Sequence, residues 1–139
     1  MRTLTLRGEE ETRAFAEDLA AGLRPNDVVA LVGDLGTGKT TMTKYIAAAL
    51  GVTEPVTSPT FTIVQEHRSG RLPLFHFDVY RVDSPQEILD VGADEYFDAG
   101  GICVIEWADR IADLLPDETK VILLRYGEKE GERILTCTF

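Results

Sequence analysis

Residues 33–40 read Gly-Asp-Leu-Gly-Thr-Gly-Lys-Thr, a complete G-x-x-x-x-G-K-T pattern. The run Val28–Val32 precedes the pattern and is apolar and mostly β-branched, as in a strand that is buried on both faces. Lys39–Leu50 is rich in helix-forming residues and is followed by Gly51, which suits a helix C-terminus. A strand, a glycine-rich loop and a helix in this order predict a site for a nucleoside triphosphate.

The residue types of this loop suit the chemistry of phosphate binding. Its glycines can adopt positive φ angles, which lets backbone N–H groups point toward phosphate oxygens at the positive end of the following helix. Lys39 can reach the β- and γ-phosphates, and the Thr40 hydroxyl can ligate Mg²⁺. Thr41 is expected to contact the α-phosphate. The residues predicted to contact the nucleotide in this segment are Asp34, Leu35, Gly36, Thr37, Gly38, Lys39, Thr40 and Thr41.

Length and charge limit the other functions of the chain. The 139 residues suffice for one domain, and 14 basic against 24 acidic residues give a net charge of −10. Such a charge argues against direct binding to DNA or to an RNA backbone, so a role with RNA would run through another protein. No apolar run approaches the roughly 20 residues of a membrane span, and no signal peptide is seen, which predicts a cytoplasmic protein without a membrane partner.

Apolar spacing and turn residues predict the remaining elements. Strands are expected at residues 3–6, 61–65, 72–78, 102–105, 121–126 and 134–139, and helices at residues 10–23 and 108–115. Glycines in the connections predict that the second and third of these strands form a hairpin, as do the last two.

A further short helix is expected to begin at Ser84. Pro85 suits its first position, Glu87 completes a capping box with Ser84, and Gly92 marks its end. Together the elements predict a single α/β domain over residues 1–139. It is expected to have a P-loop NTPase fold, with a mixed, mainly parallel central sheet flanked by helices.

Two carboxylates close apolar strands and are candidates for the site. Glu106 follows residues 102–105, and Asp78 follows residues 74–77. A nucleotide site needs such a group, because Mg²⁺ prefers hard oxygen ligands and a hydrolytic water must be held in line. The alternative is that each carboxylate only marks the point where a strand reaches solvent.

Four stretches carry a family resemblance: residues 33–41 (GDLGTGKTT), 58–62 (SPTFT), 76–81 (HFDVYR) and 105–107 (IEW). Their order and residues resemble the bacterial TsaE (YjeE) family. These ATPases support the synthesis of N6-threonylcarbamoyladenosine next to the anticodon of tRNAs that decode ANN codons. The resemblance covers nearly the whole chain and implies an ATPase that uses ATP and Mg²⁺.

The resemblance also implies roles for individual residues. Lys39 would hold the phosphates, Thr40 and Glu106 would bind Mg²⁺, and Asp78 would orient or activate the attacking water. The residues implied as a switch that senses the γ-phosphate are Ser58 and Thr60, and those implied near the adenine base are Thr12 and Arg133.

The family resemblance further implies protein partners. Members act with a complex of the TsaB and TsaD proteins, in which TsaD transfers the threonylcarbamoyl group to tRNA and the ATPase resets the complex. The acidic charge of this chain agrees with such a division of labour. We therefore expect contact with tRNA only indirectly, through the complex.

Other functions use the same loop and remain open at this stage. A GTP-driven switch is disfavoured, because the sequence has no Asn-Lys-x-Asp or Thr-Lys-x-Asp segment to read guanine. A P-loop phosphotransferase acting on a small molecule or a protein is the second candidate, and a nucleotide-binding regulatory module is the third. Arg81 and Arg110 could stabilise phosphate charge or form salt bridges with nearby carboxylates, and His67 and His76 are expected to be surface or packed residues.

Overall fold

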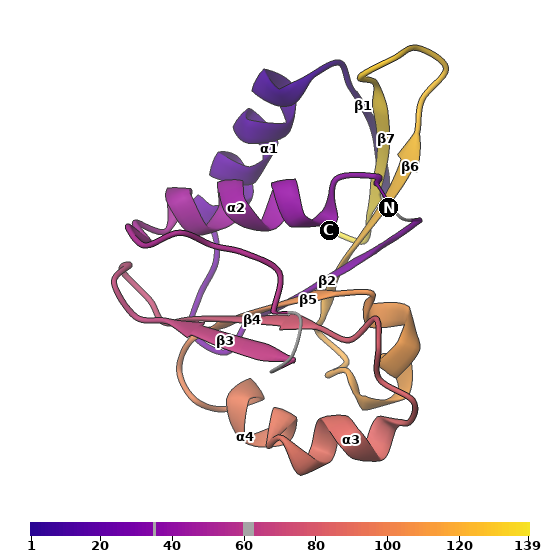
Figure 1. Ribbon diagram of the computed structural model, residues 1–139. Helices are drawn as coiled ribbons and strands as arrows, with labels where there is room; N and C mark the ends of the chain where they lie inside the picture. The colour runs from indigo at the N-terminus through magenta and orange to yellow at the C-terminus, as the bar shows by residue number, and fades with distance from the viewer. Residues whose placement is uncertain (35, 60–62) are drawn as a thin grey trace.

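The computed structural model describes residues 1–34, 36–59 and 63–139 of the chain. Within these residues, seven strands form one sheet with helices on both faces (Figure 1). The strands are β1 (Arg2–Leu6), β2 (Val28–Gly33), β3 (Val64–His67), β4 (Leu74–Asp78), β5 (Ile102–Glu106), β6 (Lys120–Tyr126) and β7 (Arg133–Cys137). The helices are α1 (Glu9–Ala21), α2 (Lys39–Ala49), α3 (Pro85–Asp90), α4 (Ala93–Phe97) and the 3-10 helix η1 (Ala108–Leu114).

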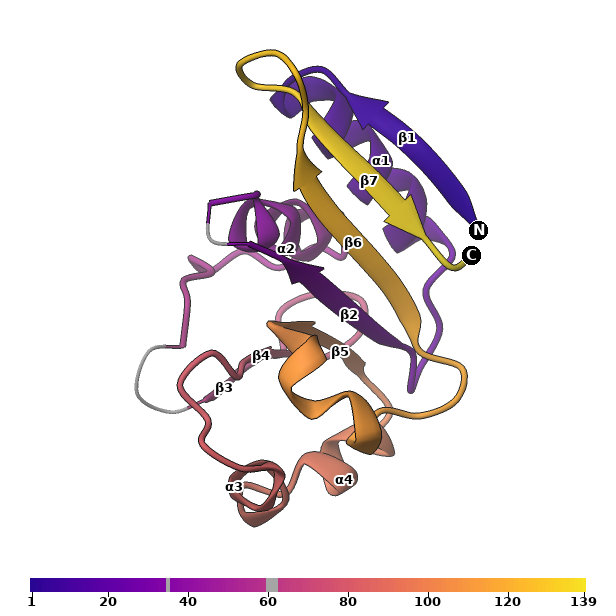
Figure 2. The ribbon, with the colours of Figure 1, turned by 90° about the vertical axis from the view of Figure 1, so that its right-hand side faces the viewer.

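The sheet has a parallel centre and antiparallel edges. Its strand order is β1-β7-β6-β2-β5-β4-β3. Strands β6, β2, β5 and β4 pair in parallel, whereas β7 lies antiparallel to both β6 and β1, and β3 lies antiparallel to β4 (Figure 2). Among the described strands, only β7 and β3 therefore run against the common direction. The prediction of an α/β domain with a mixed, mainly parallel sheet is confirmed.

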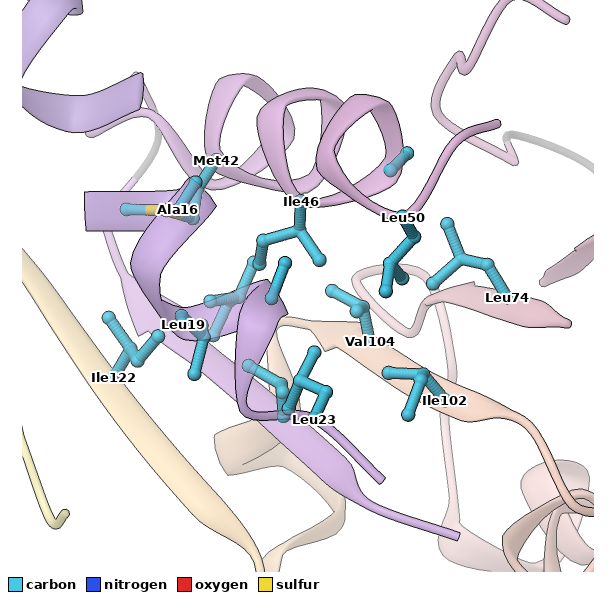
Figure 3. Packing of buried hydrophobic residues seen from close by; sticks show 14 of the residues in the cluster. Ala16, Leu19, Leu23, Met42, Ile46, Leu50, Leu74, Ile102, Val104 and Ile122 are labelled. Carbon is cyan, nitrogen blue, oxygen red and sulfur yellow. The ribbon is translucent and has the colours of Figure 1, made fainter. Parts of the chain in front are cut away.

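Both faces of the central strand β2 are buried, which explains its continuous apolar sequence. Val29 and Leu31 belong to a core that also contains residues of α1 and α2. Figure 3 shows part of this core, including Ile46 of α2 and Val104 of β5. Val28 and Ala30 belong to a second core on the opposite face, which also contains residues of α3, α4 and η1. The sheet is thus a layer between two apolar cores, and its strand ends are held rigidly.

The register of three parallel strands brings their carboxyl ends together. Leu31 of β2 and Asp78 of β4 are both paired with Glu106 of β5. In open α/β sheets, ligands bind outside the carboxyl ends of the strands, where the loops leave the sheet. The fold therefore places the glycine-rich loop after β2 beside both candidate carboxylates.

Several local expectations differ from the structure. Ser84 does precede α3, but its side chain caps no N–H of the helix; instead its carbonyl accepts the N–H of Glu87 at 3.2 Å, so the predicted capping box does not form. The predicted helix at residues 108–115 is a 3-10 helix that is broken at Ile111. Helix α4 was not predicted, since it spans only five residues and its Tyr96 ring packs on Phe75 of the sheet.

The other boundaries differ by a few residues. Helix α1 ends at Ala21 instead of residue 23, and β7 ends at Cys137 instead of residue 139. Of the strand expected at 61–65, residues 61 and 62 lie outside the described part, and β3 begins at Val64. Both predicted hairpins are confirmed. None of the helices in the described ranges has the length and hydropathy needed to cross a membrane.

Candidate functional site

The glycine-rich loop between β2 and α2 has two positions whose backbone conformation strongly favours glycine. Gly36 and Gly38 have φ angles of 81° and 103°, in the left-handed region that side chains rarely adopt. At Gly36 a Cβ atom would also lie 2.5 Å from the Tyr126 hydroxyl oxygen. Gly38 is the N-terminal cap of α2, so the helix begins directly at the end of the loop.

Lys39 holds its charge inside the curve of this loop. Its side chain is 4% exposed, and Nζ donates to the carbonyl oxygens of Gly33 and Asp34 at 2.7 and 2.8 Å. Nζ also lies 3.9 Å from the centre of the Trp107 ring, a favourable position for a cation. Burial lowers the pKa of Lys39, and the carboxylate of Glu106 is the strongest of the charges that oppose this effect.

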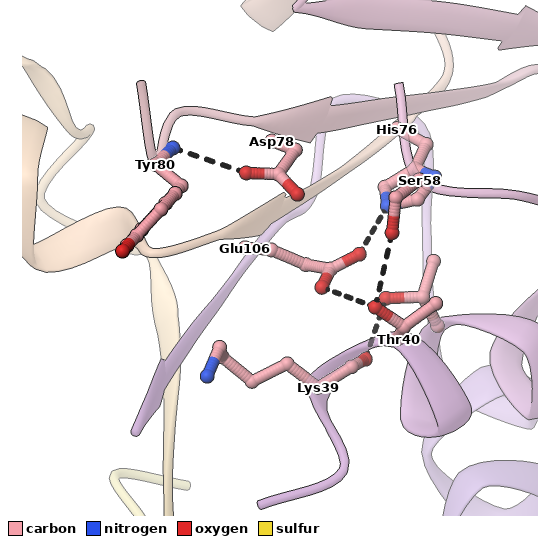
Figure 4. Close-up of polar contacts among 8 residues, drawn as sticks. Lys39, Thr40, Ser58, His76, Asp78, Tyr80 and Glu106 are labelled. Carbon is pink, nitrogen blue, oxygen red and sulfur yellow. Dashed lines mark hydrogen bonds and ion pairs between the residues drawn. The ribbon is translucent and has the colours of Figure 1, made fainter. Parts of the chain in front are cut away.

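A buried carboxylate joins α2 to strands β4 and β5 (Figure 4). Glu106, at the end of β5, is 2% exposed, and its Oε1 accepts the Thr40 hydroxyl at 2.7 Å. Its Oε2 lies 2.5 Å from Nε2 of His76 in β4. The Thr40 hydroxyl is also 3.3 Å from Oγ of Ser58, in the loop that follows α2. Strand β5, helix α2 and strand β4 thus meet at one carboxylate, and the loop after α2 joins them through Thr40.

The donor set of this cluster fits Mg²⁺. The hydroxyl of Thr40 and the carboxylate of Glu106 are hard oxygen ligands that already lie within hydrogen-bond distance of each other. In the described part of the chain, no group of three or more His, Cys, Asp or Glu residues could hold a metal ion by itself. Mg²⁺ in phosphate sites takes one or two protein ligands and completes its shell with water and phosphate oxygens, so such a group is not required.

Asp78 lies beside Glu106 at the end of β4. Its Oδ1 accepts the backbone N–H of Tyr80 at 3.0 Å, which fixes the carboxylate at the strand end. Burial raises the pKa of Asp78 above its usual value, the Tyr80 N–H acts in the opposite direction, and the neighbouring Glu106 raises it further. A carboxylate with a raised pKa is a stronger base than an ordinary one, as proton abstraction near neutral pH requires.

These groups line a cleft of about 550 Å³ outside the strand ends. We call it the main cleft; its lining residues are Gly36, Gly38, Lys39, Thr40, Thr41, Ser58, Pro59, Ile63, Asp78, Tyr80, Arg81, Val82, Glu106 and Trp107. The volume is within the range of small-molecule sites. One wall carries the Tyr80 and Trp107 rings, whose centres are 4.6 Å apart. Trp107 has a φ of 62°, an uncommon value for a bulky residue, and this turn at the end of β5 places its ring over Lys39.

A smaller cavity of about 210 Å³ lies on the other side of Gly38 and Thr41, which line both cavities. We call it the side pocket; its lining residues are Leu6, Gly8, Glu9, Thr12, Thr37, Gly38, Thr41, Met42, Leu124, Gly131 and Arg133. Arg133 fastens this side of the glycine-rich loop, because its guanidinium donates to the carbonyls of Thr37 at 3.2 Å and Gly36 at 3.4 Å.

The structure brings most of the predicted site residues together, in two groups. Lys39, Thr40, Asp78, Glu106 and Ser58 line the main cleft, and those expected near the base, Thr12 and Arg133, line the side pocket. The shared position of Thr41 suits the expected α-phosphate contact.

Other predicted residues have different surroundings. Thr37 is buried and its hydroxyl donates to the Asp34 carbonyl at 2.7 Å, so it braces the loop from within. Asp34 is exposed and lines neither cavity; it contributes its carbonyl to Lys39. Leu35 and Thr60 lie outside the described residues.

The partner of His76 and the place of Arg81 were not predicted from the sequence. His76 is packed, as expected, but against the site carboxylate; a polar residue between Phe75 and Phe77 in a buried strand was the available signal. Arg81 lines the main cleft, and Arg110 lies 5.2 Å from the Tyr80 ring centre. The ion pairs found within the described ranges include neither arginine, so the salt-bridge alternative is not supported there.

Comparison with known proteins identifies the family. The family model described as "Threonylcarbamoyl adenosine biosynthesis protein TsaE" matches residues 6–135. The chain belongs to the TsaE family. A tRNA threonylcarbamoyladenosine biosynthesis protein TsaE of Bacillus subtilis (strain 168) is 49% identical over 129 residues, which cover 92% of this chain and 80% of the relative. A TsaE protein of the same description from Treponema pallidum (strain Nichols) is 42% identical over 130 residues, covering 94% and 95% of the two chains.

A solved structure of the family has the same fold. The crystal structure of Bacillus subtilis YdiB superposes with a TM-score of 0.83 at 42% sequence identity, over 98% of this chain and 83% of that one. The family resemblance found in the sequence is thus confirmed over the length of the domain, and the mixed sheet described above is the family fold.

Proposed function

We propose that this TsaE-family chain is a Mg²⁺-dependent ATPase that serves the formation of threonylcarbamoyladenosine in tRNA. The observation that carries the proposal is the convergence of Lys39, Thr40, Glu106 and Asp78 on one cleft at the carboxyl ends of the parallel strands. A cation, two metal-ligating oxygens and a carboxylate base are the groups that hydrolysis of a phosphoanhydride requires.

In the proposed reaction, the protein binds the triphosphate along the glycine-rich loop. The Lys39 ammonium would exchange its two carbonyl partners for β- and γ-phosphate oxygens, and the N-terminus of α2 would face the same charge. Thr40 and Glu106 would hold Mg²⁺, which when bound neutralises charge on the β- and γ-phosphate oxygens.

The proposed base is Asp78. It lies beside Glu106, a proposed metal ligand, but is not itself proposed to bind the metal. It would orient a water molecule and take its proton as the water oxygen bonds to the γ-phosphorus. The bond from the γ-phosphorus to the bridging oxygen breaks, which leaves ADP and inorganic phosphate. The backbone N–H of Tyr80 keeps Oδ1 of Asp78 fixed, so the other oxygen remains for the water.

The side pocket supports the choice of a nucleotide over a smaller phosphate compound. It adjoins the main cleft at Thr41, the residue expected at the α-phosphate, and three of its lining residues, Leu6, Met42 and Leu124, offer apolar surface for a base. We assign the adenine base to this pocket, between Thr12 and Arg133.

The names of the relatives support the place of the reaction in the cell. The TsaE proteins of B. subtilis and T. pallidum are described as tRNA threonylcarbamoyladenosine biosynthesis proteins. We propose that this chain acts in the cytoplasm with TsaB and TsaD and that its hydrolysis resets their complex. Its net charge of −10 favours contact with tRNA through these partners over direct binding.

The test is hydrolysis and modification measured on the same preparation. The purified chain is given ATP labelled at the γ-phosphate with Mg²⁺ or with EDTA, alone and with TsaB, TsaD and tRNA. Release of labelled phosphate that needs Mg²⁺ and rises with the partners, together with modified tRNA, is the expected result. If the label appeared on a protein or a small acceptor instead of in free phosphate, the chain would be a phosphotransferase and not an ATPase.

A further inference from the structure

His76 is a polar residue in an otherwise apolar strand, and its burial is complete. It lies between Phe75 and Phe77 in β4 and is 0% exposed. Its Nε2 is 2.5 Å from Oε2 of Glu106, while Nδ1 has no hydrogen-bond partner among the described residues. Burying an imidazole costs free energy unless its nitrogens form hydrogen bonds. A fully buried histidine with a hydrogen bond at only one nitrogen therefore suggests that this bond has a function.

The hydrogen bond fixes which ring nitrogen carries the proton. The Glu106 carboxylate can only accept, so the proton of this pair lies on Nε2. His76 then occupies Oε2 of the carboxylate, and Thr40 occupies Oε1. The two oxygens of Glu106 are thus divided between His76 of β4 and Thr40 at the start of α2.

We propose that His76 is a positioning residue for the metal site: it holds Glu106 so that Oε1 points at Thr40 and at the Mg²⁺ that the two would share. The inference rests on the proposed function, since it concerns the metal of that site. A glutamate has three side-chain torsions, and the last of them is broad, so a single contact does not fix its carboxylate. Removing a residue that hydrogen-bonds to a metal ligand typically lowers metal affinity or activity 10- to 100-fold.

The chain offers a matched control in its second histidine. His67, in β3, is also buried, at 6% exposure, and its Nδ1 lies 3.1 Å from Oε1 of Glu54. Its other nitrogen likewise lacks a partner among the described residues. Yet His67 pairs with Leu74, at the opposite end of β4 from Asp78, and the Glu54 side chain is 39% exposed and lines no part of the main cleft.

The experiment separates metal binding from nucleotide binding in the full chain. ADP affinity is measured in EDTA by calorimetry, and Mn²⁺ affinity is measured by EPR at saturating ADP, for wild type, His76→Asn, His76→Gln and His67→Asn. The Gln amide nitrogen can take the place of Nε2, whereas the Asn amide nitrogen corresponds to Nδ1.

The expected result is that His76→Asn weakens Mn²⁺ binding about 10- to 100-fold and leaves ADP affinity in EDTA within about twofold. His76→Gln should recover most of the loss, and His67→Asn should bind Mn²⁺ as wild type does. Wild-type Mn²⁺ affinity in His76→Asn would overturn the inference, as would an equal loss in a folded His76→Gln.

A measurement on the wild-type chain covers the case in which the variants do not fold. Imidazole ¹⁵N NMR should show the His76 proton on Nε2, with a resonance that shifts when Mg²⁺ is added to the ADP complex while that of His67 does not. A proton on Nδ1, or no response to Mg²⁺, would overturn the inference. If the wild type bound no ADP at all, the proposed function would fail instead, and the protonated nitrogen of His76 could still be read.

Discussion

The main cleft and the side pocket share Gly38 and Thr41 but differ in what lines them. The main cleft holds three charged groups: Lys39 at the start of α2, and Asp78 and Glu106 at the ends of neighbouring strands. The side pocket is smaller, and many of its walls are apolar or backbone, with Arg133 turned toward the carbonyls of the loop. The first has the groups for bond cleavage, and the second has the shape for selecting a ligand.

This difference follows from the two parts of the sheet. The main cleft is built where the parallel strands β2, β4 and β5 end, in a register fixed by two buried cores. Beyond the glycine-rich loop and α2, the side pocket is built from the end of β1 and the β6–β7 hairpin, at the antiparallel edge of the sheet, and from the start of α1. We therefore expect substitutions in the cleft to lower kcat, and substitutions in the pocket to raise KM alone.

The largest effect is expected from Lys39→Ala. The change removes the buried ammonium group that bonds to the loop carbonyls, so ATP hydrolysis should fall about 100-fold or more. Phosphate release at saturating ATP measures it. Lys44→Ala, an exposed position on the same helix, is the control and should retain wild-type activity. If Lys39→Ala released phosphate within tenfold of the wild-type rate, the loop would have no part in the reaction.

A slightly smaller effect is expected from Asp78→Asn, and it should be confined to kcat. The amide oxygen can still accept the Tyr80 N–H, but the base is lost, so kcat should fall by a factor of about 100 to 10,000. ATP affinity should change little, because the cavity keeps its shape. Steady-state kinetics separates the two constants, with exposed Asp83→Asn as the control. A rise in KM with unchanged kcat would place Asp78 in binding instead of chemistry.

Arg133→Ala should have a moderate effect, on KM and not on kcat. The guanidinium lines the side pocket and holds the carbonyls of Thr37, which lines the same pocket, and of Gly36, so its loss should raise KM for ATP about 3- to 10-fold, as expected for one or two hydrogen bonds. The value of kcat should be unchanged. If kcat fell instead as far as in Asp78→Asn, the two cavities would not be functionally separate.

The smallest effect is on the stability of the free protein. Since burial raises the pKa of Asp78 above 3.8, folding favours its protonated form, and the ionised form costs stability as the pH rises through the raised pKa. Asp78→Asn should therefore be slightly more stable than wild type near neutral pH, and the difference should vanish below about pH 3.8. Urea unfolding at several pH values measures it, and a variant less stable at pH 7 would contradict the assignment.

Local signals in the sequence predicted the parts that depend on local structure. The glycine-rich loop, the strand before it and the carboxylates that end β4 and β5 each have a pattern that neighbouring residues determine. The register that sets Asp78 beside Glu106 was not predicted, because it depends on the pairing of β4 with β5.

Features that depend on tertiary contacts could not be predicted in the same way. Helix α4 is too short for periodicity to be seen, and its place depends on Tyr96 packing against the Phe75 and Phe77 rings. The bond between His76 and Glu106 joins residues 30 positions apart, so nothing near either residue reveals it. The surroundings of Thr12 and Arg133 likewise arise only when β1 and β7 close the edge of the sheet.

The proposed ATPase function is tested most directly by ATP hydrolysis with TsaB, TsaD and tRNA, measured for the wild-type chain and for Asp78→Asn. We expect the wild type to release phosphate in a Mg²⁺-dependent reaction and to yield modified tRNA. With Asp78→Asn we expect both to be lost while ATP still binds. Equal phosphate release by the two proteins, or modification of tRNA without hydrolysis, would refute the proposed function.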